Sequence, residues 1–447
     1  MTIALRVAGA ATSTTAAVTA VSPAVGAGAA GSDLSVLCVA CKPYTTTLTT
    51  PANWTKLGET TNGTVASAAD VGSTKVALYY RVGAPVGAIG NIAQTGADTM
   101  VAQITTYSTS AGGWDTAAIG SGFTAGGDTT NGANYSATGA ASIGVTAGDW
   151  VYSGTAVNTD LGTPTAIAIG GLAGATMGTL ATRSTGLVST GNDARLVVVD
   201  RPVTAGTSTT APTLTYTNAS NSSGSTMWVR LREAPLPKAE TLVDEFTTKD
   251  TTKWTWGSTA GVTGGRASFT SIQAGTAWME STSRYDLVNS SVVCYVPTYA
   301  GSTAVGSLSL ELRLATSANS RTAATYLALI ADPGAVGVLE ARASTSGNAT
   351  FLVNDVDLSL STHLWWRFRC DGTSVFWEAS TDGVTYTTFL TYLLSSLTPW
   401  TPTGLMVAFN GFSDDVHTGA FEVEHVNGGG VEPPAAVVFR RPGKRVW

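Results

Sequence analysis

Short apolar or alternating runs, separated by turn residues, recur along the whole chain. In the first half they cover Leu34–Lys42, Lys75–Val82, Thr99–Tyr107, Asp149–Val157, Ala194–Asp200, Thr213–Thr217 and Met227–Arg232. In the second half they cover Ser290–Val296, Gly306–Leu314, Thr325–Ile330, His363–Cys370, Val375–Ser380, Gly404–Asn410 and Ala420–Val426. Runs of this kind with Asn and Gly between them are typical of strands joined by tight turns. The pattern therefore predicts an all-β protein.

Changes in composition divide the chain. Residues 1–233 are rich in Ala, Gly, Thr and Ser and form an N-terminal β unit. Residues 234–241 contain Pro235 and Pro237, which favour an extended linker. Trp and charged residues become commoner over 242–427, which marks a second β unit, and 428–447 form a Gly hinge and a basic C-terminal tail. We therefore expect two all-β domains in series, followed by an extended tail, and the resemblances of the two units imply that each is a jelly-roll-like β-sandwich domain.

The clearest local structure is a hairpin around Asp371-Gly372. A two-residue turn there pairs Phe368 with Val375 and places one apolar face in the core. The opposite face carries the rings and charges of Trp365, Arg367, Arg369, Phe376 and Glu378.

Two uses suit this mixed aromatic and charged face. Protein interfaces are enriched in Trp and Arg. Sugars also bind by stacking on aromatic rings and by hydrogen bonding to planar polar groups. The composition favours a subunit or domain interface over a glycan-binding face, and both over an ordinary exposed surface.

Two stretches of the second half resemble a known fold family. The segment from Asp244 to Trp254 resembles the opening of concanavalin A-like (laminin-G-like) sandwich domains. The run from Trp365 to Gly383 resembles their central hairpin. The resemblance covers about residues 242–427 and implies a concanavalin A-like second domain.

The first half resembles a β-sandwich module of phage tail and surface proteins, through Pro51–Leu57 and Val76–Val82. Together with the two-module layout and the basic tail, it makes the chain similar to minor tail proteins of long-tailed phages of actinobacteria. The resemblance implies a non-enzymatic virion protein at or near the tail tip, which contributes to assembly and host-surface attachment. Its expected partners are other virion tail proteins and copies of itself, with a trimer expected by analogy with fibre proteins.

Composition excludes several other functions. Charged residues make up 12% of the chain and the net charge is −6, with no basic stripe, so nucleic-acid binding is not expected. Three His leave little for metal or imidazole chemistry, and we expect no cofactor and no metal. Arg6 interrupts the N-terminal apolar stretch, which argues against a signal peptide. We expect neither a signal peptide nor membrane insertion, with synthesis in the host cytoplasm and a place in the virion tail.

Paired carboxylates raise the question of glycan hydrolysis. Asp355 and Asp357, and likewise Glu422 and Glu424, alternate along a strand and so share a face. Retaining glycosidases need two carboxyl groups about 5–5.5 Å apart. The Glu-x-Asp-x-x-Glu pattern of concanavalin A-like hydrolases is absent, so solvated strand faces are the favoured interpretation. A glycan receptor and a glycan hydrolase stay as alternative functions.

The four cysteines and one pair of aspartates are explained by structural roles. Cys38 and Cys41 lie three apart in a predicted strand, too far for a disulfide, and are predicted to be buried thiols. Cys294 and Cys370 could form a disulfide only if their strands are neighbours. Asp414 and Asp415 are adjacent in a predicted loop, and we favour solvated carboxylates there over a Ca²⁺ site.

The C-terminal tail combines apolar residues with cations. Its docking candidates, Phe439, Arg440, Arg441 and Trp447, predict addition to the edge of a neighbouring sheet rather than a mobile tail.

Overall fold

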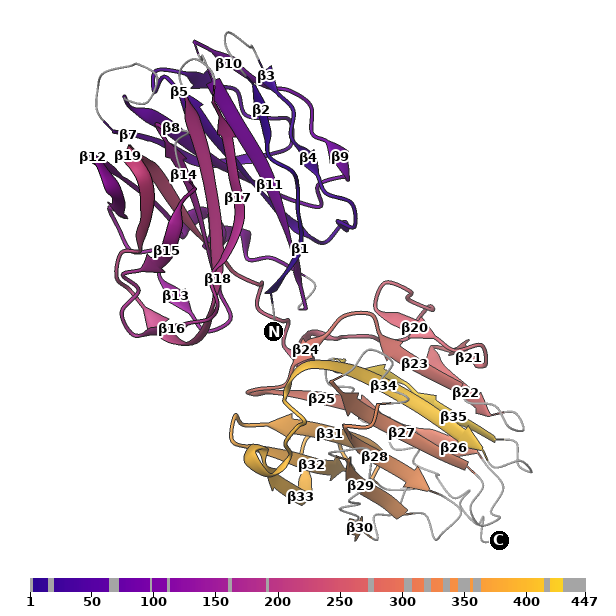
Figure 1. Cartoon of the computed structure of the whole chain (residues 1–447). Coiled ribbons are helices and arrows are strands. Elements are labelled where there is room, and N and C mark those ends of the chain that lie inside the picture. The colour runs from indigo at the N-terminus through magenta and orange to yellow at the C-terminus, as the bar shows by residue number, and fades with distance from the viewer. Residues whose placement is uncertain are drawn as a thin grey trace, which may run out of the picture. The chain divides into compact units, whose positions relative to one another are not determined.

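The computed structural model describes residues 3–14, 20–63, 72–96, 99–110, 113–159, 163–189, 193–271, 277–300, 308–316, 323–332, 338–344, 354–356, 363–413 and 419–428. The chain divides into two compact units, Met1–Pro235 and Leu236–Trp447, and the division falls inside the expected linker at 234–241 (Figure 1). Both units are built from β-sheets, which confirms the all-β prediction of two sandwiches in series.

Unit 1 contains two large antiparallel sheets, named here after a central strand of each. The β5 sheet has the order β1-β11-β5-β8-β7, with β2 also beside β11. Its strands are β1 (Ile3–Ala8), β2 (Thr12–Thr14), β5 (Leu34–Lys42), β7 (Thr55–Asn62), β8 (Thr74–Val82) and β11 (Thr99–Thr109).

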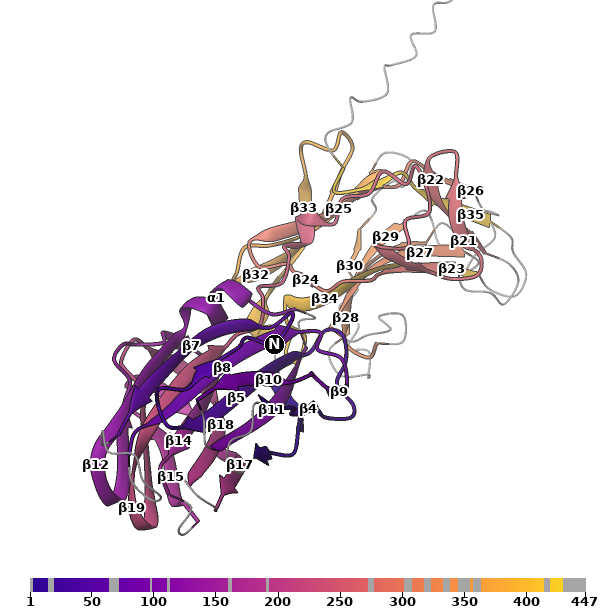
Figure 2. The ribbon, with the colours of Figure 1, turned by 90° about the horizontal axis from the view of Figure 1, so that it is seen from above.

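The β14 sheet forms the second layer. Its order is β12-β19-β14-β18-β13, with β15 beside β19 and with β16 and β17 beside β18. Its strands are β12 (Phe123–Thr138), β13 (Val145–Thr146), β14 (Trp150–Val157), β15 (Thr165–Gly170), β16 (Ala175–Met177), β17 (Ala181–Val188), β18 (Ala194–Ser208) and β19 (Thr213–Leu231). The runs expected at 213–217 and 227–232 belong to the single strand β19, which pairs along β12 as a long ribbon (Figure 2).

Short elements complete unit 1. They are β3 (Ala20–Val21), β4 (Ala24–Val25), β6 (Thr47–Leu48), β9 (Gly87–Ala88), β10 (Ile92–Thr95) and α1 (Thr116–Ser121). The helix is capped by the side chain of Asp115, which accepts from the Ala118 N–H.

Alternation along the central strands buries both faces of the large sheets. In β19, Met227 and Val229 face the core between the two sheets, and Trp228 faces a further apolar cluster on the other side. In β5, Val36 faces the shared core and Leu37 faces a third cluster. Each apolar residue of these strands is therefore used for packing.

The two sheets of unit 1 repeat one topology. The order β1-β11-β5-β8-β7 in the first corresponds to β12-β19-β14-β18-β17 in the second. The pairing of β7 with β8 shifts register between Lys56 and Gly58, and the pairing of β17 with β18 shifts between Thr182 and Ser184. The two shifts fall at the same place in β7 and β17. The two halves of unit 1 therefore share strand order, pairing and a β-bulge, although no fixed-period repeat is visible in the sequence.

Unit 2 is a jelly-roll-like sandwich. One face is the β34 sheet, in the order β20-β23-β34-β27-β28-β29-β30, with β24 also beside β34. Its strands are β20 (Trp254–Trp256), β23 (Ala277–Ser281), β24 (Tyr285–Asp286), β27 (Leu308–Ala315), β28 (Tyr326–Asp332), β29 (Val338–Ser344), β30 (Asn354–Val356) and β34 (Thr403–Ser413).

The β31 sheet of unit 2 has the order β33-β32-β31-β25-β36, and a smaller sheet has the order β21-β22-β35-β26. Their strands are β21 (Ala260–Thr263), β22 (Arg266–Ser271), β25 (Ser290–Tyr295), β26 (Thr298–Ala300), β31 (Trp365–Cys370), β32 (Ser374–Ser380), β33 (Thr387–Leu393), β35 (Gly419–Val423) and β36 (His425–Val426). Two short 3₁₀ turns are η1 (Ala239–Thr241) and η3 (Leu394–Ser396). Leu312, Phe409, Trp366, Phe368 and Trp377 meet in the core between the β34 and β31 sheets.

The predicted hairpin forms with a different turn. Cys370 pairs with Val375, and Phe368 pairs with Trp377 rather than with Val375. The predicted two-residue turn is therefore wrong: three residues, 371–373, join β31 to β32, and the pairing is shifted. Asp371 stabilises this longer turn because its Oδ1 accepts from the N–H groups of Thr373 and Ser374 at 2.9 and 2.8 Å. The shift is two residues, so every side chain keeps its predicted face.

All four cysteines are free and buried. Cys294 pairs in register with Trp366 and Cys370 with Ser290, so the two thiols lie at different positions along neighbouring strands. Burial raises the pKa of both thiols, and it raises the pKa of Cys41 to about 12. The prediction of buried structural thiols is confirmed.

Candidate functional site

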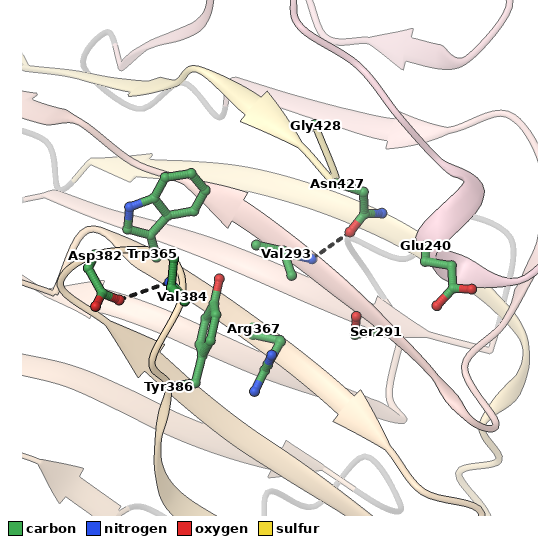
Figure 3. Close-up of a pocket in the computed structure, with 11 residues that line it drawn as sticks. Glu240, Ser291, Val293, Trp365, Arg367, Asp382, Val384, Tyr386, Asn427 and Gly428 are labelled. Atoms are coloured by element: carbon green, nitrogen blue, oxygen red, sulfur yellow. Dashed lines mark hydrogen bonds between the residues drawn. The ribbon is translucent and has the colours of Figure 1, made fainter. Parts of the chain in front are cut away.

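A pocket lies on the face of the β31 sheet that points away from the core of unit 2 (Figure 3). Its volume is about 330 Å³, at the lower end of the range for small-ligand sites. The pocket is lined by Glu240, Ser291, Val293, Trp365, Arg367, Asp382, Gly383, Val384, Tyr386, Asn427 and Gly428. Strands β25 and β31 form its floor, and the turn between β32 and β33 forms one wall.

The five residues predicted for this face do lie on it together, but they have different roles. Trp365 and Arg367 line the pocket, whereas Arg369, Phe376 and Glu378 lie outside its lining. The Arg369 guanidinium stacks on the ring of Phe376 at 3.9 Å.

Glu378 is buried and organises the charged part of the face. Its carboxylate accepts from Arg367 Nε at 2.5 Å, from Arg369 Nη2 at 3.0 Å and from Thr388 Oγ1 at 3.0 Å. Burial acts to raise the pKa of Glu378, but the hydrogen bonds from Arg367 and Arg369 outweigh it and hold the pKa below its ordinary value. Glu378 is thus a structural anion that orients two guanidinium groups.

Trp365 is 8% exposed and lies in an aromatic cluster. Its indole packs against the rings of Tyr295 and His425, with centroids 4.6 and 4.9 Å away. A Cβ at Gly383 would lie 2.6 Å from the indole, so only glycine fits there, and its φ of 74° also favours glycine. Burial lowers the pKa of His425, which keeps this cluster uncharged. Trp365 therefore forms a wall of the pocket.

Arg367 and Tyr386 form the centre of the site, and both are partly exposed. The guanidinium carbon lies 3.7 Å from the centroid of the Tyr386 ring, and Nε is held by Glu378. The two terminal nitrogens of Arg367 are therefore positioned at the pocket by both contacts. Burial raises the pKa of Tyr386 to about 12, so its hydroxyl stays protonated as a donor. Figure 3 shows the hydroxyl between Trp365 and Arg367.

The turn at 380–385 supplies an acid and an apolar rim. Asp382 Oδ1 accepts from the N–H groups of Val384 and Thr385, both at 2.8 Å, and these bonds lower the pKa of Asp382 to about 2. Val384, at the tip of the turn, is 83% exposed. The exposed carboxylate of Glu240 lies across the pocket, on η1.

Sequence reasoning missed Glu240, Asp382, Val384 and Tyr386 as site residues. Glu240 lay in the expected linker, and Tyr386 and Val384 belong to a turn with no chemical motif. The Ser-Thr-Asp-Gly run at 380–383 is typical of a turn, but nothing in it indicates a position over the sheet.

A second polar cluster occupies the face of the β34 sheet that points away from the core. Glu311 accepts from Arg313 Nε at 3.0 Å and from Asn410 Nδ2 at 3.1 Å, and it is 1% exposed. Arg313 also stacks on Tyr326 at 3.7 Å. Glu280 is buried on β23, across β34 from Arg313, since both pair with Ala408.

The other sequence candidates separate into two groups. Glu422 and Glu424 both bind Arg266, at 2.9 and 3.1 Å, so they form an ion-paired strand face. Asp355 lies on β30 opposite Glu340. Outside the described residues lie the remaining acidic candidates and the whole C-terminal docking segment: Asp357, Asp414, Asp415, Phe439, Arg440, Arg441 and Trp447.

The described part of the chain contains no group of three or more His, Cys, Asp or Glu side chains that could hold a metal ion. None of its helices has the length and apolar character needed to cross a bilayer.

No family model and no curated protein matches the chain. A Bacillus licheniformis β-glucanase is similar at 10% identity and a TM-score of 0.33, over 41% of this chain and 95% of that chain. The catalytic domain of a Thermotoga petrophila laminarinase matches 41% of this chain and 94% of its own, at 10% identity and a TM-score of 0.33. The Crh5 transglycosylase matches 43% of this chain and 86% of its own, at 9% identity and a TM-score of 0.34.

Unit 2 is a jelly-roll-like β-sandwich, as its sheet order shows. These neighbours overturn the expectation that the chain is not an enzyme, since all three are carbohydrate-active enzymes. That expectation rested on the resemblance to phage tail proteins and on the absence of the Glu-x-Asp-x-x-Glu pattern. The likeness shows the fold alone and assigns no catalytic residue.

Proposed function

We propose that unit 2 binds a glycan in the pocket on the β31 sheet. The observation that carries the proposal is the meeting of three kinds of group in that pocket: aromatic rings, a positioned guanidinium and an exposed aliphatic rim. Sugars present C–H faces that pack on apolar groups and hydroxyls that bond to charged planar groups. Tyr386, Arg367 and Val384 supply these contacts on one side of the sheet.

We propose further that the chain is a minor tail protein of a phage virion, and that this pocket serves attachment to the host cell envelope. The support is the resemblance of the sequence to actinobacteriophage tail proteins. Low charge and abundant small β-formers suit burial against other subunits, and a homotrimer is the proposed assembly. Several copies would raise the avidity of a weak glycan site without new contacts.

Binding to purified host-envelope polysaccharide tests the glycan proposal. Tyr386→Ala should weaken binding on the order of tenfold, and Val384→Ala about threefold, as expected when aromatic and methyl contacts are removed. Leu393→Ala is the matched control, because Leu393 is an exposed aliphatic residue of the same sheet outside the pocket lining. Equal binding by all four proteins would reject the site.

The tail assignment needs a separate experiment. Mass spectrometry of purified virions should detect the chain, and sedimentation of the isolated protein should give a trimer. A chain absent from virions, or a monomer at micromolar concentration, would contradict the respective proposal.

Glycan hydrolysis is a second candidate function, favoured by the buried carboxylates of Glu280 and Glu311 on the outer face of the β34 sheet. Catalytic carboxyl groups work in such shielded surroundings, where their charge is poorly solvated. Release of reducing sugar from envelope glycan by the wild type, and its loss in Glu280→Gln or Glu311→Gln, would support hydrolysis. Undiminished release by both variants would remove this face from consideration.

A further inference from the structure

We propose that the pocket on the β31 sheet selects uncharged sugars and disfavours acidic ones, an inference that rests on the proposed glycan-binding function. Glu240 and Asp382 line the pocket from opposite sides, with Arg367 and Tyr386 between them (Figure 3). Arg367 is the one cation among the described lining residues.

The charge of Arg367 is balanced within the protein. Its Nε donates to Glu378 at 2.5 Å, and Glu378 also accepts from Arg369. Glu378, Glu240 and Asp382 together carry three negative charges. Arg367 and Arg369 carry two positive charges. The surroundings of the pocket therefore carry a net negative charge.

Asp382 keeps its charge across the physiological range. The hydrogen bonds from Val384 and Thr385 to its Oδ1 stabilise the anion, and its pKa is about 2. Glu240 is exposed, and one of its oxygens, Oε2, accepts from Ser290 Oγ at 3.3 Å. Each carboxylate has acceptor capacity beyond these bonds.

These groups suit a neutral sugar. Its hydroxyls can donate to Glu240 and Asp382 and accept from the terminal nitrogens of Arg367. A uronic or sialic acid would instead bring a carboxylate near two ionised carboxylates in a partly enclosed site, where repulsion is screened less than in bulk water. Val384 adds an apolar contact and no charge.

Calorimetric titration of the full chain with matched probes tests this selectivity. The probes are glucan, galactan and mannan oligosaccharides, each with its C6-oxidised uronate counterpart. We expect the neutral member of a bound pair to bind on the order of tenfold tighter. The ratio of the dissociation constants of the acidic and neutral probes should shrink in about 0.5 M salt, because the screening length falls to a few ångströms.

Asp382→Asn and Glu240→Gln each remove one negative charge from the pocket. Each should improve binding of the acidic probe several-fold and so reduce the preference for the neutral probe. Asn keeps the acceptor oxygen of the turn, and Glu240 is exposed, so both variants are expected to fold. Asp371→Asn is the control, because Asp371 caps a similar turn of the same sheet outside the pocket lining.

Three outcomes would count against the inference. An acidic probe that binds as tightly as its neutral partner, or a ratio unchanged in Asp382→Asn and Glu240→Gln, overturns the selectivity while glycan binding stands. Failure of every probe to bind, together with no effect of Tyr386→Ala on binding to envelope polysaccharide, overturns both proposals.

Discussion

Trp365 and Glu378 have the residue types of a binding face, but their surroundings give them structural roles. Trp365 is enclosed by Tyr295, His425 and Gly383, and Glu378 is enclosed by two arginines and a threonine. The groups left for a ligand are at the edges of this network: the terminal nitrogens of Arg367, the Tyr386 hydroxyl and the rim residues Asp382 and Val384. Variants that test binding should therefore be made at the rim.

Trp365→Ala should act mainly on stability. Removing a packed indole leaves a cavity, and we expect unit 2 to lose about 3 kcal/mol of unfolding free energy. Chemical denaturation followed by the fluorescence of the remaining tryptophans measures this. Val384→Ala is the control and should change stability by less than about 0.5 kcal/mol, because the side chain is 83% exposed. A Trp365 variant as stable as wild type would contradict the enclosed geometry.

Glu378 should make the stability of unit 2 pH-dependent. Its pKa is below the ordinary value in the folded state, so its contribution is complete above the unfolded pKa of about 4.3 and is lost as the pH falls through the folded value. Glu378→Gln should cost about 1–2 kcal/mol at pH 7, a moderate figure because Arg367 and Arg369 are partly exposed. Denaturation midpoints from pH 3 to 7 should fall less steeply below pH 4.5 in the variant. Glu240→Gln should retain the wild-type profile.

At the scale of elements, unit 1 shows the same arrangement built twice. Asp33, before β5, accepts from the Ala30 N–H at 2.8 Å, and Asp149, before β14, accepts from the Thr146 N–H at 2.8 Å. Each aspartate also binds an arginine, Arg6 in the first half and Arg232 in the second. The backbone oxygen of each accepts at 2.8 Å from the strand that pairs alongside, at Gly83 and Val203.

These equivalent positions predict equivalent energetic effects. Asp33→Ala and Asp149→Ala should each destabilise unit 1 by about 1–2 kcal/mol, because each leaves an N–H group and an arginine without their acceptor. The loss should be larger for Asp149, because the two hydrogen bonds from Arg232, at 2.8 and 2.6 Å, are shorter than the two from Arg6 to Asp33, at 3.1 and 3.4 Å. Thermal unfolding of the full chain measures both. Asp250→Ala, in unit 2, should leave the unit 1 transition in place, and a neutral Asp149 variant would argue against the equivalence.

The whole molecule consists of two units, each with its own hydrophobic core. The apolar clusters of unit 1 draw only on residues before 236, and that of unit 2 only on residues after it. Each unit has more than 200 residues, enough to bury a core of its own.

Separate cores predict separate folding. Fragments 1–235 and 236–447 should each unfold cooperatively, and scanning calorimetry of the full chain should resolve two transitions at the fragment temperatures. A fragment that is unfolded when expressed alone would show that its stability depends on the other unit.

The sequence alone determined part of the secondary structure. Strands β5, β8, β14, β25 and β32 begin and end within one residue of their predicted bounds, because a two-residue alternation of apolar side chains is a local property. It also determined which side chains share a face of the β31–β32 hairpin, since a register error of two residues leaves the faces unchanged. What a face becomes depends on segments far away in the chain. The turn at 380–385 covers Trp365, and η1 brings Glu240 to the pocket. Such contacts arise from packing between distant residues, and no local pattern of hydrophobic and polar positions encodes them.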